Sequence, residues 1–472
     1  MRLSRWVTAI AAAQLAVLLA TAWRYGYHRD ELYFIVAGSH PALGYPDQPP
    51  LVPLLAWALH SIHPSLTLLR APSAIASAAT TMLAALVTRE VGGATRAQVV
   101  AAGCTAVSGF ALAVGHFVTT TTFDLLSTTA FLWLLIRGVR RGGGPSLLAA
   151  GLVAGIGCEA KPQVAFVGVV AVAALLVLGP RQPLRSPWAL AGVVAAIAIV
   201  APYAVWQQLH GWPQLTVASN IGGSAEGGRA GFIPFQLVMV SPLLVPVWVA
   251  GLLAPFRRAE WRALRFLPWA YAACGLLYIA GNGKAYYLAS FYPALLGLGA
   301  VPTAKWLRTR GRRVVLVAAV VVSAAFSAYI ALPLLPAGSL QGSAPMKINP
   351  DIGEEVGWPA FAATVSRAWD SIPNRAHTAI FTGNYGEAAA VQLLAHLHAF
   401  SGQTGFALWG PPPATDTRAL VIGGTYLFDH CRRLATIYNG LGLQNDEQGT
   451  PVSLCRPSAP WPVLWPRLRH YD

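Results

Sequence analysis

Long apolar runs separated by short polar segments fill the first two thirds of the chain. A helix that crosses the hydrocarbon core of a bilayer needs about 20 mostly apolar residues. The pattern predicts about eleven membrane-spanning helices, at 6–23, 66–88, 97–115, 117–137, 145–160, 163–179, 187–206, 232–254, 265–280, 285–302 and 313–334. The segment 51–63 is apolar but too short to span, and its pattern is typical of a helix that lies in the membrane interface.

The first apolar run has two interpretations. Arg2 and Arg5 precede it, and Ala20-Thr21-Ala22 fits a cleavage site, as in a secretory signal peptide. We favour an uncleaved first helix, because ten further spans follow it.

After residue 335 the pattern changes to that of a small α/β domain. Segments 377–381 and 419–423 are predicted to be strands, and segment 387–398 is predicted to be a helix. We therefore expect an all-α polytopic membrane domain over 1–335 and a tail domain over 336–472.

The charge distribution predicts the orientation of the chain. Only 11% of the residues are charged and 55% are hydrophobic, which excludes a disordered chain and an ordinary soluble enzyme. With the N-terminus in the cytoplasm, the inner loops hold 18 of the 33 Lys and Arg residues, the outer side of the membrane region holds six, and the tail holds nine. This bias is typical of an inner face against anionic membrane lipids. It indicates a multi-pass plasma-membrane protein with an extracytoplasmic tail, and it removes nucleic acid as a partner for the net charge of +15.

On the oxidising outer side, Cys431 and Cys455 of the tail could form a disulfide. The acidic residues of the membrane region gather on the same side. Six of the eight that precede residue 336 fall there, and carboxylates at a membrane tend to mark function. The six are Asp30, Glu31, Asp47, Asp124, Glu159 and Glu226.

The first outer loop, 24–65, carries one candidate site. If 29–39 is helical, Asp30, Tyr33, Phe34 and Ala37 share a face, which presents a carboxylate over an aromatic patch. The alternative is a solvated acid that caps the helix.

Three charged residues at outer helix ends form a second group of candidates. Asp124 lies inside the fourth span, where a carboxylate is costly unless it faces a wet cavity or is satisfied by neighbouring threonines. Lys161 and Lys284 lie beside glycine and near Tyr or Pro, where each could hold an anionic headgroup or extend to the interface. Together with Arg29, Arg70 and Arg229 they suggest a phosphate-binding outer cavity.

These residues occur in an order that resembles a known family. Arg29-Asp30-Glu31-Leu32-Tyr33-Phe34 is followed by Gly44-Tyr45-Pro46-Asp47-Gln48-Pro49-Pro50-Leu51, then by Asp124, Lys161 and Gly283-Lys284-x-Tyr286-Tyr287-Leu288. The series is similar to the dolichyl-phosphate-mannose–protein mannosyltransferase superfamily (glycosyltransferase family 39 type), which includes lipid A aminoarabinose transferase-like enzymes. That resemblance implies the GT-C membrane fold and a polyprenyl-phosphate sugar donor.

The resemblance also implies roles for these residues. Asp30, the first acid of the Asp30-Glu31 pair, would be the catalytic carboxylate that activates or orients the acceptor, and Glu31 is counted with it among the expected catalytic residues. Lys161, Lys284 and Arg229 would stabilise the leaving phosphate. The remaining expected substrate-binding residues are Arg29, Tyr33, Asp47, Gln48, Asp124, Tyr286 and Tyr287.

The chain departs from the family pattern at two places. Phe34 stands where relatives often have Tyr, and Asp47-Gln48-Pro49 stands where aminoarabinose transferases have Glu-Lys-Pro. Because that Lys helps to bind donor phosphate, Gln48 weakens a claim to that particular donor. In the tail, the turns at 383–388 and 408–412 resemble those of actinobacterial-type relatives, and they could contact an acceptor or pack inside the domain.

The predicted function is an inverting membrane glycosyltransferase, hexosyl or pentosyl, that moves a sugar from a polyprenyl-phosphate donor to a cell-envelope glycan, lipid or protein. A transporter or flippase of lipid-linked sugars is the alternative, and a non-catalytic sensor or assembly partner is a third class. We expect no obligatory metal, since the outer acids are dispersed along the chain, although a divalent cation could bind if they converge.

Overall fold

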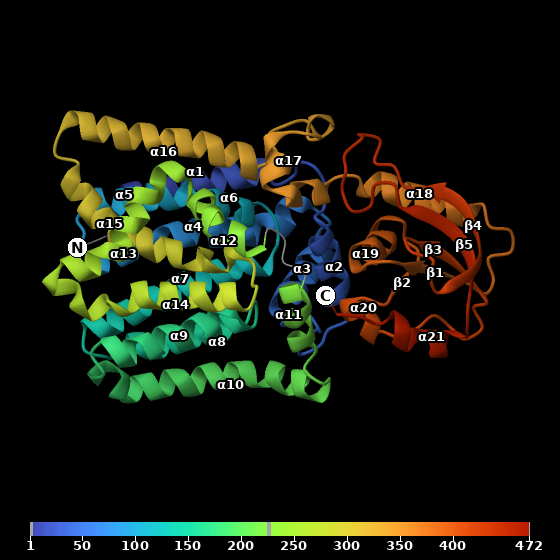
Figure 1. Ribbon diagram of the computed structural model, residues 1–472, viewed down its shortest axis with the longest axis horizontal. Coiled ribbons are helices and arrows are strands. Elements are labelled where there is room, and N and C mark those ends of the chain that lie inside the picture. The colour runs from blue at the N-terminus through green and yellow to red at the C-terminus, as the bar shows by residue number, and fades with distance from the viewer. Residues whose placement is uncertain (1–2, 224–227, 472) are drawn as a thin grey trace. The chain divides into compact units, whose positions relative to one another are not determined.

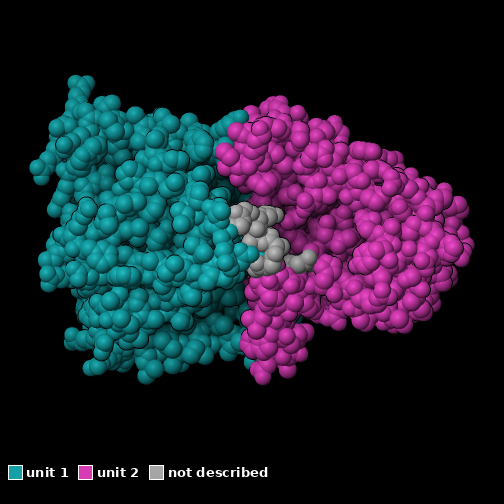
Figure 2. Space-filling view, viewed as in Figure 1, with its two compact units in different colours: residues 1–22, 70–206, 221–332 teal, residues 23–69, 207–220, 333–472 magenta. Residues whose placement is uncertain are grey.

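The computed structural model describes residues 3–223 and 228–471, so Arg2 and Glu226 lie outside the described residues. The chain divides into two compact units, coloured teal and magenta in Figure 2. The first, called here the helical unit, comprises 1–22, 70–206 and 221–332, and the second, the loop–tail unit, comprises 23–69, 207–220 and 333–472. The segment 24–65, which was predicted to be the first outer loop of the membrane domain, thus packs with the tail.

Helices lie side by side as a bundle in the helical unit (Figure 1). Its elements are α1 (Arg5–Thr21), α4 (Leu66–Glu90), α5 (Thr95–Ala106), α6 (Gly109–His116), α7 (Thr120–Arg140), α8 (Pro145–Cys158), α9 (Gln163–Leu178), η1 (Gln182–Arg185), α10 (Pro187–Leu209), α12 (Gly228–Val240), η2 (Pro242–Leu244), α13 (Val245–Arg257), η3 (Ala259–Leu264), α14 (Phe266–Ala280), η4 (Ala285–Phe291), α15 (Tyr292–Trp306) and α16 (Arg310–Ala331).

All eleven apolar segments are helical, but two of them are broken. The chain bends by 57° between α5 and α6, where Ser108 caps the second helix. It bends by 81° after Ser241, which precedes a proline and cannot easily continue a helix. Among the described residues, five helices are long and apolar enough to cross a membrane, or seven if each bent pair is one span. The count of eleven spans stays a prediction.

Two strongly apolar helices lie at the edges of the bundle and are exposed. Only 11% of the most apolar stretch of α10 is buried, and only 22% of that of α16. Figure 1 shows these two helices on opposite sides of the bundle. A water-soluble surface does not present apolar area of this extent, so these faces suit contact with lipid and fit a multi-pass membrane protein.

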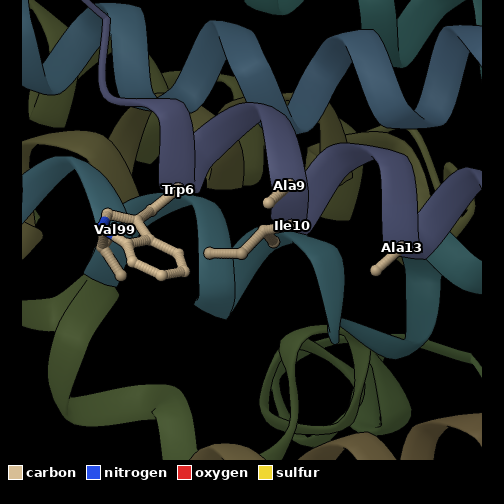
Figure 3. Close-up of a pocket in the computed structure, with 5 residues that line it drawn as sticks. All are labelled: Trp6, Ala9, Ile10, Ala13 and Val99. Atoms are coloured by element: carbon tan, nitrogen blue, oxygen red, sulfur yellow. The ribbon is translucent and has the colours of Figure 1, made fainter.

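The surface of the bundle also carries an apolar cavity of about 450 Å³. Trp6, Ala9, Ile10 and Ala13 of α1 line it together with Val99 of α5 (Figure 3). None of the predicted site residues lines this cavity, so the cavity is not part of the predicted active site.

The loop–tail unit combines the segment 23–69 with the α/β tail. Its elements are α2 (Arg29–Gly38), α3 (Leu51–Ile62), α11 (Pro213–Gly223), η5 (Ala337–Ser339), α17 (Ala344–Ile348), η6 (Pro350–Glu355), α18 (Trp358–Asp370), β1 (Thr378–Thr382), α19 (Tyr385–Leu394), β2 (Phe400–Ser401), α20 (Thr404–Leu408), β3 (Arg418–Ile422), β4 (Phe428–Thr436), β5 (Pro451–Pro457) and α21 (Trp461–Leu468).

A five-stranded sheet with the order β2-β1-β3-β5-β4 forms the core of the tail. β1 pairs in parallel with β2 and β3, whereas β5 is antiparallel to β3 and β4. All of β1 and most of β3 are buried, which explains their continuous apolar runs. Trp461, Leu464 and Trp465 of α21 pack against one side of the sheet.

These elements confirm the predicted α/β tail. The predicted strands at 377–381 and 419–423 correspond to β1 and β3, and the predicted helix corresponds to α19. That helix ends at Leu394, and His396, which was expected to be helical, has a positive φ of 53°. Cys431 of β4 and Cys455 of β5 are joined by a disulfide.

Candidate active site

The candidate catalytic acid lies in the first turn of α2. His28 caps this helix: its Nδ1 accepts a hydrogen bond from the Asp30 backbone N–H at 3.2 Å. Glu31 completes the capping box, because its Oε2 accepts a hydrogen bond from the His28 backbone N–H at 2.9 Å. The helix that was only assumed over 29–39 is present as α2, and its local sequence explains where it begins.

Asp30 and Glu31 have different surroundings. The Glu31 side chain is fully buried and engaged in the cap of its own helix. The Asp30 side chain is 31% exposed, so a substrate group could reach it. Glu31 therefore stabilises the start of α2, and Asp30 is the better candidate for the catalytic carboxylate.

A tyrosine of the tail contacts Asp30. The hydroxyl of Tyr385, the first residue of α19, donates a hydrogen bond of 2.7 Å to Asp30 Oδ1. Burial raises the pKa of Tyr385 well above its ordinary value, so this hydroxyl stays a donor at neutral pH. Tyr385 was not among the predicted site residues, although it lies in the turn 383–388 that resembled those of relatives.

A second tyrosine holds Asp47, the third acid of the loop. The Tyr33 hydroxyl donates a hydrogen bond of 2.8 Å to Asp47 Oδ1 and accepts one of 3.1 Å from the Gly405 backbone N–H. Burial raises the pKa of Asp47 to about 7, although the bond from Tyr33 lowers it. Tyr33 is itself buried, so its hydroxyl acts here on a neighbouring acid.

Arg29 and Gln48 complete the predicted set in the loop. The Arg29 guanidinium lies 2.6 Å from Asp446 and 3.9 Å from Glu354, and 5.9 Å from the centre of the Tyr385 ring. Two tail carboxylates therefore compensate a charge that we expected to face phosphate. Gln48 is buried, and no residue within the described ranges accepts a hydrogen bond from its Nε2.

Other predicted residues come together in the helical unit, around Asp124 of α7. This carboxylate is fully buried. Its Oδ1 accepts a hydrogen bond of 3.1 Å from Thr128, and its Oδ2 accepts one from Ser290 of η4. The buried charge is thus partly satisfied by hydroxyl groups, as one of the two interpretations of the sequence expected.

Lys161 lies close to this carboxylate, between α8 and α9. Its Nζ donates a hydrogen bond of 2.9 Å to Thr121 and lies 5.3 Å and 5.1 Å from the ring centres of Tyr286 and Tyr287. Asp124 attracts the ammonium group, and Lys284 repels it. The structure therefore brings together five predicted residues: Asp124, Lys161, Lys284, Tyr286 and Tyr287.

Two other cations of the expected phosphate cavity have different contacts. Arg70 is fully buried and donates a hydrogen bond of 3.0 Å to the Ala22 carbonyl that follows α1. Arg229 is exposed and contacts the Ala280 carbonyl at 3.5 Å. Neither contact involves Lys161, and the phosphate cavity predicted from these cations stays a prediction.

The carboxylates of the described residues do not form a metal cluster of the usual kind. In the ranges 3–223 and 228–471, no group of three or more His, Cys, Asp or Glu side chains could hold a metal ion.

Comparisons with known proteins cover part of these residues. Residues 47–206 match the family model described as dolichyl-phosphate-mannose-protein mannosyltransferase. The chain is also 32% identical over 153 residues to the lipopolysaccharide core galacturonosyltransferase RgtA of Rhizobium johnstonii. That match covers 31% of this chain and 30% of RgtA, so it spans less than a third of the relative.

Solved structures match over nearly the whole chain. ArnT from Cupriavidus metallidurans bound to undecaprenyl phosphate has a TM-score of 0.65 at 14% identity, over 95% of this chain and 98% of that one. The chain has the GT-C fold of the mannosyltransferase and ArnT type. The apo form of that ArnT has a TM-score of 0.63 at 15% identity, over 96% and 98% of the two chains. The archaeal oligosaccharyltransferase AglB from Archaeoglobus fulgidus, in complex with an inhibitory peptide and a dolichol-phosphate, has a TM-score of 0.52 at 13% identity, over 84% of this chain and 64% of that one. The predicted resemblance and the predicted fold type are thereby confirmed.

Proposed function

We propose that this protein is an inverting glycosyltransferase that moves a sugar from a polyprenyl-phosphate donor to a cell-envelope acceptor on the outer face of the plasma membrane. The observation that carries the proposal is the family match over 47–206, because Asp47, Asp124 and Lys161 all lie within it. The relative RgtA is named a galacturonosyltransferase, and the matching ArnT structure holds undecaprenyl phosphate. The first name points to transfer of a sugar, and the second points to a lipid phosphate.

Asp30 is the proposed catalytic carboxylate. An acceptor oxygen or nitrogen attacks the anomeric carbon, its proton passes to Asp30, and the bond from the anomeric carbon to the lipid phosphate breaks. A single displacement of this kind inverts the anomeric centre. The partial exposure of Asp30 supports this role, and the burial of Glu31 argues against a second catalytic acid next to it.

Lys161 and Lys284 are the proposed partners of the leaving phosphate. A cation held in place before the reaction stabilises the charge that develops on the phosphate, without reorganisation. The bond to Thr121 and the contacts with Tyr286 and Tyr287 fix the Lys161 ammonium in this way. Asp124 orients that ammonium and prevents excess positive charge when the site holds no anion.

Sugar transfer can be measured with the full-length protein in liposomes. The donors are undecaprenyl-phosphate galacturonic acid, mannose and 4-amino-arabinose, supplied with envelope lipid and glycan extract as acceptors. The proposal predicts that the wild type releases undecaprenyl phosphate and forms a glycosylated product, and that Asp30→Asn does neither. Equal release by Asp30→Asn would refute the catalytic assignment.

The same experiment tests two further expectations. If a donor crosses the liposome membrane and is recovered intact, the protein is a transporter or flippase. We propose that no metal is obligatory, so release should persist in EDTA, and loss that is restored by Mg²⁺ or Mn²⁺ would contradict this.

A further inference from the structure

We propose that Tyr385 of the tail is a positioning residue that fixes the orientation of the Asp30 carboxylate, so that the tail domain completes the catalytic centre. This inference rests on the proposed function, since it takes Asp30 as the catalytic group. It gives the tail a direct part in the reaction through a residue that is distant in the sequence.

The topology of the tail explains why this contact forms. Tyr385 follows the parallel strand β1, and Gly405 follows the neighbouring parallel strand β2. Open α/β sheets usually bind their ligands at the carboxyl ends of such strands. Here both segments contact α2: Tyr385 bonds to Asp30, and the Gly405 N–H bonds to Tyr33. The carboxyl edge of the parallel strands, which binds a small molecule in many other α/β proteins, here contacts the helix that carries the proposed catalytic acid.

Two glycines allow this close approach. A Cβ atom at Gly386 would lie 3.0 Å from the Cβ atom of Arg29. One at Gly405 would lie 2.8 Å from the Tyr33 hydroxyl oxygen. Both distances are shorter than ordinary contacts, so the smallest residue stands where the tail segments meet α2.

The surroundings of Tyr385 make its hydroxyl a rigid donor. Its ring lies 4.8 Å from the Tyr33 ring, and the Arg29 guanidinium lies over its face at 5.9 Å. Asn384 caps α19 just before it, in a capping box with Glu387. A side chain held by packing and by a helix cap loses little freedom when it bonds, so it can hold Asp30 Oδ1 in one geometry. The other oxygen, Oδ2, lies 4.0 Å from the His28 Nδ1.

The hydrogen bond also predicts how Asp30 should respond to loss of the Tyr385 hydroxyl. A donor to a carboxylate favours its charged form, and removal of that donor raises the pKa of the carboxyl group. A tyrosine that only joined the tail to α2 would change the melting temperature when mutated, without changing the titration of Asp30. The two roles therefore predict different results.

The test compares Tyr385→Phe with Tyr426→Phe, a tyrosine of the same domain that is 81% exposed. Full-length protein is labelled with a carbodiimide between pH 3 and 8, and modification of Asp30 is followed by peptide mass spectrometry. We expect the labelling midpoint of Tyr385→Phe to move to higher pH and that of Tyr426→Phe to match the wild type. An unchanged midpoint in Tyr385→Phe would overturn the proposal, whether or not a donor has been identified.

Kinetics provide the second readout. Loss of a hydrogen bond to a charged group predicts a fall in kcat of roughly 10- to 100-fold in Tyr385→Phe, with an unchanged KM for donor. The acid limb of the pH–rate profile should move in the same direction as the labelling midpoint. A wild type that transfers no sugar refutes the proposed function, whereas an active Tyr385→Phe with wild-type kcat and profile refutes only the positioning role.

Discussion

Lys161 is the residue through which the proposed donor site can be tested most sharply. Its ammonium group is held by Thr121 at 2.9 Å and by two tyrosine rings at 5.3 Å and 5.1 Å. Lys161→Gln keeps a hydrogen-bond donor but removes the charge. A hydrogen bond to a charged group contributes about 1.5 to 3 kcal/mol, so the dissociation constant for undecaprenyl phosphate should rise by about 10- to 150-fold.

Binding can be measured by native mass spectrometry or by microscale thermophoresis of the purified protein with undecaprenyl phosphate. Lys347→Gln is the matched control, because Lys347 is exposed in the tail. The control should bind like the wild type. An equal affinity in Lys161→Gln would refute the assignment of this residue to the phosphate.

A second variant separates binding from folding. Lys161→Gln leaves the buried Asp124 carboxylate without its neighbouring cation, which should lower the melting temperature. Adding Asp124→Asn removes the unpaired charge and should restore much of the lost stability. The double variant should still bind undecaprenyl phosphate weakly, so a recovery of affinity together with stability would show that the lysine acts only through folding.

Three further predictions concern the loop–tail unit. Burial raises the pKa of Glu447 to about 9, so the folded protein keeps a proton that the unfolded chain releases near 4.5. The melting temperature should therefore fall as the pH rises from 5 to 9. Glu447→Gln should reduce this pH dependence, whereas the control Asp370→Asn should not. Gly405→Ala should displace the Tyr33 hydroxyl from Asp47 and lower transfer activity about tenfold, which corresponds to a loss near 1.4 kcal/mol. Gly338→Ala should keep wild-type activity, because a Cβ atom at Gly338 would have no neighbouring atom nearer than 3.9 Å. Replacing Cys431 and Cys455 by serine opens a loop of 24 residues and should destabilise the tail by about 3 to 4 kcal/mol, as seen by urea unfolding; an unchanged midpoint would contradict this.

Patterns of apolar residues predicted the helices of the bundle well, because an apolar helix can be recognised from the run of apolar residues in its own segment. The strands β1 and β3 of the tail were predicted for the same reason, whereas the helix over 29–39 was only assumed. The breaks after α5 and at Ser241 were not, since a capping serine and a residue before proline interrupt a run whose average hydrophobicity stays high.

The pairing of charges across long separations could not be predicted. Arg29 was expected to face phosphate but meets Asp446, more than 400 residues away in the chain. Asp30 and Glu31 look equivalent in the sequence, and only the capping geometry separates a buried cap from a reachable acid. Tyr385 could be noticed only as part of a turn that resembled relatives, because nothing local shows that α19 begins beside α2.

The most direct test of the account is the fate of the anomeric bond in the purified full-length protein. Undecaprenyl-phosphate galacturonic acid, labelled at the anomeric carbon, is incubated with the protein in liposomes and envelope acceptor. NMR then reports the configuration of the new linkage. We predict release of undecaprenyl phosphate, a product of inverted configuration, and no release by Asp30→Asn. A product of retained configuration, or equal release by Asp30→Asn, would contradict the account.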